Sequence, residues 1–468
     1  MKIYNSLSRQ IEKFVPINPP NVGMYSCGPT VYWNQHIGHL RRYVGDDILR
    51  RALELNGYKV TQVMNITDVG HLTSDADEGE DKMEKGARKL GKTVWEVAAL
   101  YEKQFFDSLD RLNIVRPNIV CRATEHIEDQ IALITKLEEK GYAYKTDSGV
   151  YFDVSKFENY TKLSGQKLAD LLVKAREDVV VDTQKKNPAD FALWVLTIGI
   201  HQNHTMRWES PWGTGFPGWH IECSAMSMKY LGETIDIHTG GIDHIPIHHT
   251  NEIAQSEAAT GKQFVHYWIH NEFLLIDGKK MSKSLGNLFT IEDIEKKSID
   301  PLALRYLYLT AHYRDPLNFS WKSLEASQNA LNKLASQVSN FKSQKDRTAL
   351  SKEKNSKIQF YSHKFFNAVN DDLKVPRALA TVWEVVKSNI PDYDKYDLIV
   401  SFDEVLGLGL ARALADKQFP KEVKLLLEER DKLRQEGKFR EADEVRIKIH
   451  DLGFKTEDTP SGFGVKKL

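Results

Sequence analysis

A strand–helix–strand pattern near the start of the chain limits its possible folds more than any other feature. An apolar run over residues 23–28 is followed by a helical pattern over residues 39–57 and by a second apolar run over residues 58–67. Such a unit predicts two parallel strands joined by a right-handed crossover, and ligands bind these sheets at the carboxyl ends of the strands. We therefore expect an α/β fold whose site lies just after the first strand.

The string His36-Ile37-Gly38-His39 lies at this end of the predicted strand. A helix that begins here presents free backbone N–H groups and partial positive charge, and both suit a phosphate. Gly38 lets the backbone approach a ligand without a Cβ in the way. The imidazoles of His36 and His39 can donate hydrogen bonds to phosphoryl oxygens as negative charge builds there. We therefore expect this string to bind phosphate groups.

A second string far along the chain complements the first. It comprises Lys280, Met281, Ser282, Lys283 and Ser284, and it lies between two glycines, Gly278 and Gly286. The glycines predict a mobile loop that brings Lys280 and Lys283 over bound phosphates. Either string alone is also compatible with a helix start or an exposed turn. Both strings in this order predict a site that holds the triphosphate of ATP from two sides.

Four further residues have side chains that suit a metal ion: Cys27, Cys223, His248 and Glu252. His248 and Glu252 are four residues apart in a helix-like stretch, so both project from one face. Cys27 ends the first strand, and we expect Cys223 in a later strand of the same sheet. Thiolate, imidazole and carboxylate ligands together suit Zn²⁺. Two other interpretations remain open, a purely structural zinc and cysteines that pack as small apolar side chains.

The two phosphate-binding strings are the HIGH and KMSKS signatures of class I aminoacyl-tRNA synthetases. Together with CGPTVY, GWHIECSAMS and HHTNEIAQSE, they make the chain resemble the cysteinyl-tRNA synthetases. The resemblance covers the catalytic part nearly throughout and the C-terminal third more weakly. It implies ligation of L-cysteine to its tRNA through cysteinyl-adenylate, with ATP and Mg²⁺. It also implies one zinc ion per chain that binds the substrate thiolate.

The resemblance further assigns roles to individual residues. His36, His39, Lys280 and Lys283 would carry the catalysis. Thr67 matches a position near the substrate amino group, Trp219 and His238 match the walls of the cysteine pocket, and Gly241 and Asp243 match a turn near the ATP ribose. Trp219 alone is equally compatible with a core aromatic residue. Among the remaining histidines we expect several ordinary structural ones.

The sequence pattern and the resemblance together predict four parts, the first in two segments, with an α-helical C-terminal region. The parts are a Rossmann-like catalytic domain over residues 1–117 and 211–300, an inserted α+β subdomain over 118–210, a helical stem-contact region over 301–345 and a helical anticodon-binding region over 346–468. The tail departs from the family pattern, because Val465 stands close to the position of a terminal tryptophan.

Composition constrains the environment of the chain more than its partner. Hydrophobic residues make up 41% of the 468 residues and charged residues 28%, as in ordinary globular proteins. No apolar run is long enough to span a membrane, and three cysteines favour a reducing cytoplasm over a disulfide framework. A net charge of −1 leaves RNA binding undecided. We expect a cytoplasmic monomer, since no pairing stripe is visible.

Two other functions are compatible with parts of this pattern. A cysteine-activating ligase of thiol biosynthesis, which joins the adenylate to an amino sugar, would share both strings and the metal residues. It would not need the long helical region after Asn340. A catalytically silent tRNA-binding or regulatory protein is the other candidate, and the two intact strings argue against it.

Overall fold

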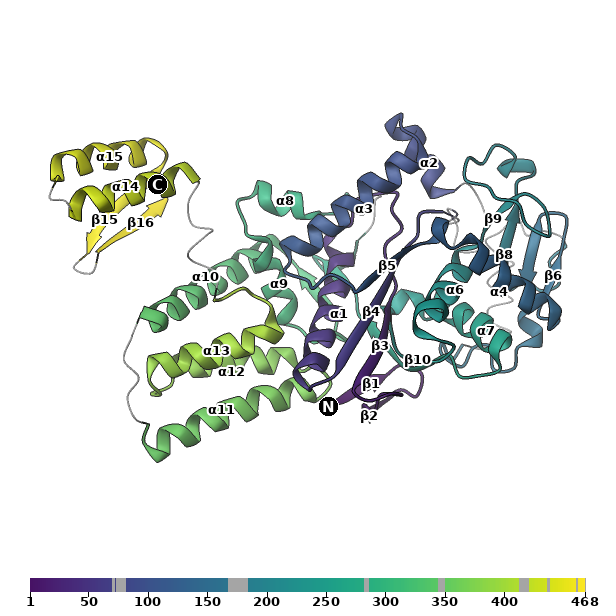
Figure 1. The fold of residues 1–468 in the computed structure, drawn as a ribbon, viewed down its shortest axis with the longest axis horizontal. Helices are drawn as coiled ribbons and strands as arrows, with labels where there is room; N and C mark the ends of the chain where they lie inside the picture. Colours follow the sequence, from purple (N-terminus) through teal and green to yellow (C-terminus); the bar gives the residue numbers. More distant parts are fainter. Residues whose placement is uncertain are drawn as a thin grey trace.

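The chain folds around a five-stranded parallel sheet (Figure 1). In sheet order, its strands are β11 (Val265–Asn271), β10 (Ile235–Gly241), β3 (Asn21–Ser26), β4 (Lys59–Ile66) and β5 (Ile119–Arg122). The computed structural model describes residues 1–69, 72, 81–166, 184–281, 286–343, 350–411, 421–435, 438–459 and 462–467. The chain order reverses at β3, which lies between β10 and β4. The crevice expected at such a reversal therefore opens after β3, at Cys27.

Helices cover both faces of this sheet, α1 (Ile37–Leu55) and α3 (Val94–Arg111) on one face and α6 (Trp219–Leu231) and α7 (His248–Thr260) on the other (Figure 1). The expected crossover is confirmed, because α1 connects the parallel strands β3 and β4. Its apolar face, with Leu40, Val44 and Ile48, is buried. His36 caps the helix: its side chain accepts a hydrogen bond from the backbone N–H of His39.

A second sheet is inserted after β5. It is antiparallel and consists of β6 (Ala143–Lys145), β7 (Gly149–Phe152), β8 (Phe191–Leu196) and β9 (Gly215–Pro217), with α4 (Ile127–Glu139) alongside. The hairpin expected from alternation over residues 141–154 is thus present as β6 and β7. Two strands lie on the other side of the expected domain limits. Strand β5 falls within the residues expected for the inserted subdomain but pairs within the central sheet, and β9 falls within the residues expected for the catalytic domain but pairs within the inserted sheet.

A small three-stranded sheet leads into the second phosphate-binding string. It contains β12 (Leu274–Ile276), β13 (Lys279–Lys280) and β14 (Leu317–Phe319). Along the chain, α8 (Ile291–Lys296) lies between β13 and β14. Asp277 and Gly278 both have positive φ between β12 and β13, which is the backbone of a tight two-residue hairpin. The backbone of Lys280 therefore belongs to a strand rather than to an open loop.

The C-terminal part is helical, as expected. It contains α9 (Pro301–Leu309), α10 (Trp321–Ser343), α11 (Lys352–Asn370), α12 (Val375–Lys387) and α13 (Asp392–Leu406), and then α14 (Lys421–Gln435) and α15 (Phe439–Asp451). Arg305 of α9 joins this part to the sheet domain, because its Nη2 lies 2.5 Å from Asp47 Oδ2 and both side chains are fully buried. No helix in the described parts of the chain is both long and apolar enough to cross a membrane.

The end of the chain differs from the expected helices. A hairpin of β15 (Phe454–Thr459) and β16 (Gly462–Lys467) follows α15. Together with α14 and α15 it forms a small module with its own core, drawn in yellow and apart from the bundle in Figure 1. A hairpin alone is barely stable in water, so its formation depends on packing against α15, which sequence periodicity does not reveal. The N-terminal hairpin of β1 (Lys2–Asn5) and β2 (Gln10–Lys13) completes the fold.

Candidate active site

A cavity of about 520 Å³ opens at the carboxyl end of β3 and gathers most of the residues expected at the site. Its lining includes residues expected to hold a metal, phosphates, the amino acid and ribose: Cys27, Cys223, His248, His36, Gly38, His39, Thr67, Trp219, Gly241, Asp243 and Met281. These residues come from segments more than 200 positions apart in sequence. Their meeting in one cavity is what the two strings and the metal residues together predict.

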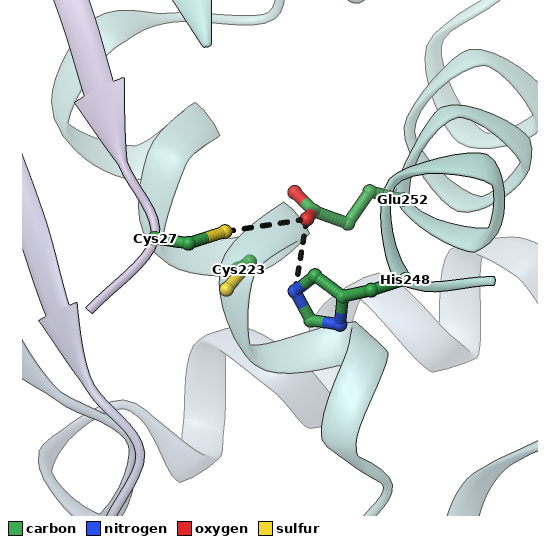
Figure 2. Close-up of side chains that lie close together, drawn as sticks. All are labelled: Cys27, Cys223, His248 and Glu252. Atoms are coloured by element: carbon green, nitrogen blue, oxygen red, sulfur yellow. Dashed lines mark hydrogen bonds and ion pairs between the residues drawn. The ribbon is translucent and has the colours of Figure 1, made fainter. Parts of the chain in front are cut away.

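The metal end of the cavity is built from the end of β3 and from helices α6 and α7 (Figure 2). Cys27 follows β3, Cys223 lies on α6, and His248 and Glu252 lie one turn apart on α7. One ligand atom from each of these four buried residues lies within 4.8 Å of the others. The expected convergence is therefore present. The expectation that Cys223 lies in a strand is wrong, since it lies in the second turn of α6.

Glu252 is the centre of the contacts at this end. Its Oε1 lies 3.0 Å from His248 Nε2 and 3.9 Å from Cys27 Sγ. Its Oε2 lies 2.9 Å from His238 Nε2. His238 is fully buried on β10, and the cavity lining does not include it. In this structure His238 therefore lies behind Glu252, where it can hold the carboxylate in place.

Two further histidines support the cluster, although sequence patterns did not distinguish them from structural ones. His249 Nε2 lies 3.3 Å from Cys27 Sγ, and its Nδ1 lies 2.8 Å from His270 Nε2. On the other side, Nδ1 of His220 lies 3.0 Å from Nδ1 of His248. The three-residue spacing of His249 and Glu252 on α7 was the available clue, because it places both on one helical face.

The protonation of these side chains favours metal binding. Burial alone would raise the pKa of Cys27, but a hydrogen bond from Cys223 and the nearby imidazoles lower it well below the ordinary thiol value. Burial raises the pKa of Cys223. Burial would also lower the pKa of His248, whereas the Glu252 carboxylate raises it to about 10. The cluster thus attracts positive charge, which a divalent cation supplies in place of a proton.

The distances are close to those of a zinc site. Zn–ligand bonds of about 2.0–2.3 Å in a tetrahedron place neighbouring ligand atoms roughly 3.3–3.8 Å apart. The observed separations of 3.0 Å and 3.9 Å from Glu252 Oε1 lie on either side of this range. The contact of His248 Nδ1 with His220 leaves its Nε2, which faces Glu252, for the metal. Cys27, Cys223 and His248 line the cavity, so an ion held by them is open to a ligand there.

The end of the cavity that is expected to hold the nucleotide begins at α1. Nδ1 of His36 accepts the backbone N–H of His39 at 3.3 Å, so its proton resides on Nε2 when the ring is neutral. The two imidazoles stack with ring centroids 3.6 Å apart. The hydroxyl of Tyr308 donates to the backbone oxygen of Ile37 at 2.6 Å and holds the first turn of the helix. Both histidines line the cavity, where they can donate to a phosphate.

The two phosphate-binding strings meet directly at Gly38. A Cβ on Gly38 would lie 2.8 Å from Sδ of Met281 and 3.0 Å from the ring of His36. The glycine therefore lets Met281 approach the start of α1. Ser282, Lys283 and Ser284 lie outside the described residues, and so does the side chain of Lys280. The structure thus brings the second string to the first through Met281.

The side of the cavity that is expected to hold the amino acid contains Thr67 and Trp219. The ring of Trp219 lies 4.5 Å from the ring of His248 between centroids. The hydroxyl of Thr67 donates to Glu222 Oε2 at 2.9 Å and accepts from Asn65 Nδ2 at 3.0 Å. Sequence patterns did not single out Asn65 or Glu222, since neither belongs to a spacing that predicts a site. Burial raises the pKa of Glu222 well above its ordinary value, although the Thr67 bond opposes the shift.

Comparison with known proteins gives a consistent result. Residues 13–329 match the family model described as the tRNA synthetases class I (C) catalytic domain. Cysteine–tRNA ligase 1 of Burkholderia lata is 48% identical over 465 residues, which cover 99% of this chain and 96% of that protein. Cysteine–tRNA ligase of Treponema denticola is 45% identical over 498 residues, with both chains covered completely.

Solved structures with low sequence identity share the fold. Methionyl-tRNA synthetase of Mycobacterium tuberculosis in complex with methionyl-adenylate gives a TM-score of 0.56 at 15% identity, over 83% of this chain and 90% of that one. The LeuRS–tRNA–LeuAMS ternary complex of Agrobacterium radiobacter K84 gives 0.61 at 12% identity, over 85% and 84%. These likenesses concern the fold alone.

Proposed function

The chain belongs to the cysteine–tRNA ligase family of class I aminoacyl-tRNA synthetases, and from this premise we propose how its cavity performs the reaction. The enzyme activates L-cysteine with ATP and transfers it to tRNA, releasing pyrophosphate and then AMP. The observation that carries the proposal is the meeting of Cys27, Cys223 and His248 with the HIGH histidines in one cavity.

Activation needs positioning more than acid–base chemistry. The cysteine carboxylate is already a nucleophile, and it attacks the α-phosphorus of ATP. In the neutral ring His36 carries its proton on Nε2, and with His39 it can hydrogen-bond to the phosphates at the start of α1. Lys280 and Lys283 are proposed to neutralise the pyrophosphate from the opposite side, with Mg²⁺ accompanying ATP. Ser282 and Ser284 complete this loop, while Gly241 and Asp243 are proposed to contact the ribose.

Cys27, Cys223, His248 and Glu252 are the proposed ligands of one zinc ion. When bound, zinc supplies a bond to the deprotonated side chain of substrate cysteine. Glu252 is held by His238, and His248 by His220, so the donor atoms are oriented before substrate arrives. Thr67 and Trp219 are proposed to border the substrate within the cavity.

This arrangement accounts for discrimination against serine. Serine differs from cysteine by oxygen in place of sulfur, and a cavity of fixed shape separates such near-isosteres only weakly. A soft metal binds a thiolate much more strongly than a neutral hydroxyl. We infer that selectivity resides at the sulfur end and that no separate editing step is required.

The remaining assignments follow the same proposal. We propose a catalytic domain that includes β5 (Ile119–Arg122), an inserted subdomain that ends with β9 (Gly215–Pro217), a stem-contact region over 301–345 and an anticodon-binding region over 346–468. The limits at β5 and β9 follow strand pairing. A reducing cytoplasm is proposed because all three cysteines are buried free thiols. A monomer is proposed, which light scattering of the purified protein tests.

The amino-sugar ligase is not favoured as an alternative. Relatives named cysteine–tRNA ligases align with the chain over 96% to 100% of their own lengths, including the helical C-terminal part. A silent protein is not favoured either, since the HIGH string lines a cavity beside a complete set of metal donors.

Cysteine-dependent ATP–pyrophosphate exchange tests the activation step, measured with and without a chelator. Charging of tRNA then tests the transfer step. We expect exchange with cysteine that the chelator abolishes, and charging of tRNA with cysteine. Exchange without charging of tRNA would contradict the proposed ligation.

A further inference from the structure

A relay of hydrogen bonds crosses the sulfur end of the cavity. The backbone N–H of Gly28 donates to Asn65 Oδ1 at 2.6 Å, and Asn65 Nδ2 donates to Thr67 Oγ1 at 3.0 Å. The hydroxyl of Thr67 donates to Glu222 Oε2 at 2.9 Å. Gly28 directly follows Cys27, and Glu222 directly precedes Cys223. The relay therefore links the two segments that carry the thiols, and Thr67, in its middle, lines the cavity.

The direction of the relay is fixed at its first bond. A backbone N–H can only donate, so the Asn65 side chain presents its oxygen to Gly28 and its amide nitrogen to Thr67. The approach is close, because a Cβ on Gly28 would lie 1.5 Å from the backbone oxygen of Asn65. Any other residue at position 28 would displace Asn65. The Asn65 orientation is thus set by the backbone and does not depend on a ligand.

The Thr67 hydroxyl has one hydrogen-bonding role left for a ligand in the cavity. A hydroxyl has one proton and two lone pairs. With Glu222 as a carboxylate, the proton is donated to Glu222, and one lone pair accepts from Asn65. The remaining lone pair can only accept a hydrogen bond. A ligand group that meets Thr67 in the cavity must therefore be a donor, which fits an ammonium group and excludes a carboxylate.

The carboxylate of Glu222 lies behind the Thr67 hydroxyl. Its side chain is fully buried, and its Oε1 has no hydrogen-bond partner among the residues that the structure describes. No ion pair within the described part of the chain involves Glu222. A buried carboxylate that forms no ion pair is costly. A cationic ligand group at Thr67 would offset that cost.

We propose that Asn65 and Glu222 are positioning residues that make Thr67 an acceptor for the α-ammonium group of the substrate, with Glu222 supplying the opposite charge. This inference rests on the proposed function, because it takes an amino acid as the ligand of the cavity. The zinc site and the relay then recognise different ends of the same molecule. One binds the thiolate, and the other binds the ammonium group.

Three thiols that differ in their charged groups separate this role from a structural one. L-cysteine and cysteamine carry the ammonium group, whereas 3-mercaptopropionate lacks it and retains the thiol and carboxylate. Binding to the zinc-loaded full-length protein is measured by calorimetry, and zinc content by elemental analysis. Glu222→Gln keeps the size of the side chain and removes its charge. We expect L-cysteine and cysteamine to bind about tenfold or more weakly, as the loss of a charged hydrogen bond implies. We expect 3-mercaptopropionate and zinc content to change little.

Two further comparisons serve as controls. Asp236→Asn removes another buried carboxylate, which accepts from the backbone of Ile17 and Gly23 and does not line the cavity. It should leave the binding of all three thiols unchanged. Thr67→Val removes the acceptor and leaves Glu222 in place, so it should reproduce the selective loss even if the Glu222 variant does not fold. Thr67→Ser retains the hydroxyl and should not show the selective loss.

Several results would overturn the inference. Equal weakening of all three thiols, or loss of zinc, would mean that the relay only holds the two cysteine segments in place. Unchanged binding of L-cysteine would mean that Glu222 is irrelevant to the ligand. Failure of the unaltered protein to bind L-cysteine in the presence of zinc would overturn the proposed function along with the inference. Normal binding without the selective pattern would overturn the inference alone.

Discussion

The two ends of the cavity differ in how completely they are built before a ligand arrives. At the sulfur end, Cys27, Cys223, His248 and Glu252 are at most 2% exposed, and each lies against other buried polar groups. At the nucleotide end, His36 and Met281 are half-buried and His39 and Asp243 are exposed. Under the proposed function, the enclosed end would select the amino acid and the open end would admit ATP. Selectivity would then depend on preorganised donors, and rate on groups that approach the phosphates.

The largest effect is expected at the sulfur end. Cys27→Ala removes one of four proposed ligands, and about a quarter of a zinc-binding free energy of about 10–16 kcal/mol corresponds to a loss of roughly 70-fold or more. We expect cysteine-dependent exchange to fall by at least this factor, while ATP binding changes little. The matched control is Cys121→Ala, because Cys121 is a buried thiol on β5 whose pKa burial raises to about 12. A similar loss in both variants would contradict a specific role for Cys27.

At the nucleotide end, Lys283→Ala is expected to lower pyrophosphate exchange by roughly 100-fold. This is the lower range for removing one group that stabilises charge in a transition state. Cysteine binding, measured by calorimetry, should not change, since the sulfur end is already formed. Lys279→Ala alters an exposed lysine of β13 in the same hairpin and serves as the control. Normal exchange in the Lys283 variant would remove the loop from the proposed mechanism.

A smaller effect is expected where the two strings touch. Gly38→Ala places a methyl group 2.8 Å from Met281 Sδ and 3.0 Å from the His36 ring, so both must shift. We expect exchange to fall by about tenfold, because displacements below 1 Å at a catalytic group cost less than the roughly 100-fold of a full ångström. Steady-state kinetics should show that the fall in exchange concerns the use of ATP, while the KM for cysteine is unchanged. A rise in the cysteine KM alone would show that the two ends are not independent.

The smallest effect on activation is expected far from the cavity. A chain that ends at Ala411 lacks α14, α15 and the final hairpin, which pack around a core of their own. Pyrophosphate exchange should therefore be retained, whereas tRNA charging should fall because the proposed anticodon-binding region is incomplete. Exchange and charging are measured on the same preparation. Loss of exchange would mean that the module stabilises the catalytic part.

Much of the fold was predictable where periodicity and packing agree. The first crossover, α3, α4 and the β6–β7 hairpin all show the spacing of their apolar residues in the sequence. Helix α6 was mistaken for a strand because His220 to Ser227 are buried on every side. A helix without a polar face has no 3.6-residue pattern, and it cannot be told from a buried strand by periodicity.

The proposed site residues were predictable to different degrees. The metal residues could be found because His248 and Glu252 have a helical spacing and both cysteines lie in distinctive strings. Asn65 and Glu222 could not be found in this way. Their roles arise from contacts between β4, Gly28 and α6, which are determined by the tertiary structure rather than by local sequence.

X-ray absorption at the zinc edge tests the account most directly, with spectra of the zinc-loaded protein alone, with ATP and with L-cysteine. The account predicts sulfur neighbours from Cys27 and Cys223 in the first two samples. It predicts one additional sulfur neighbour when L-cysteine is present and no such change with L-serine. An unchanged sulfur shell in the presence of saturating L-cysteine would contradict selection of the substrate by its thiolate.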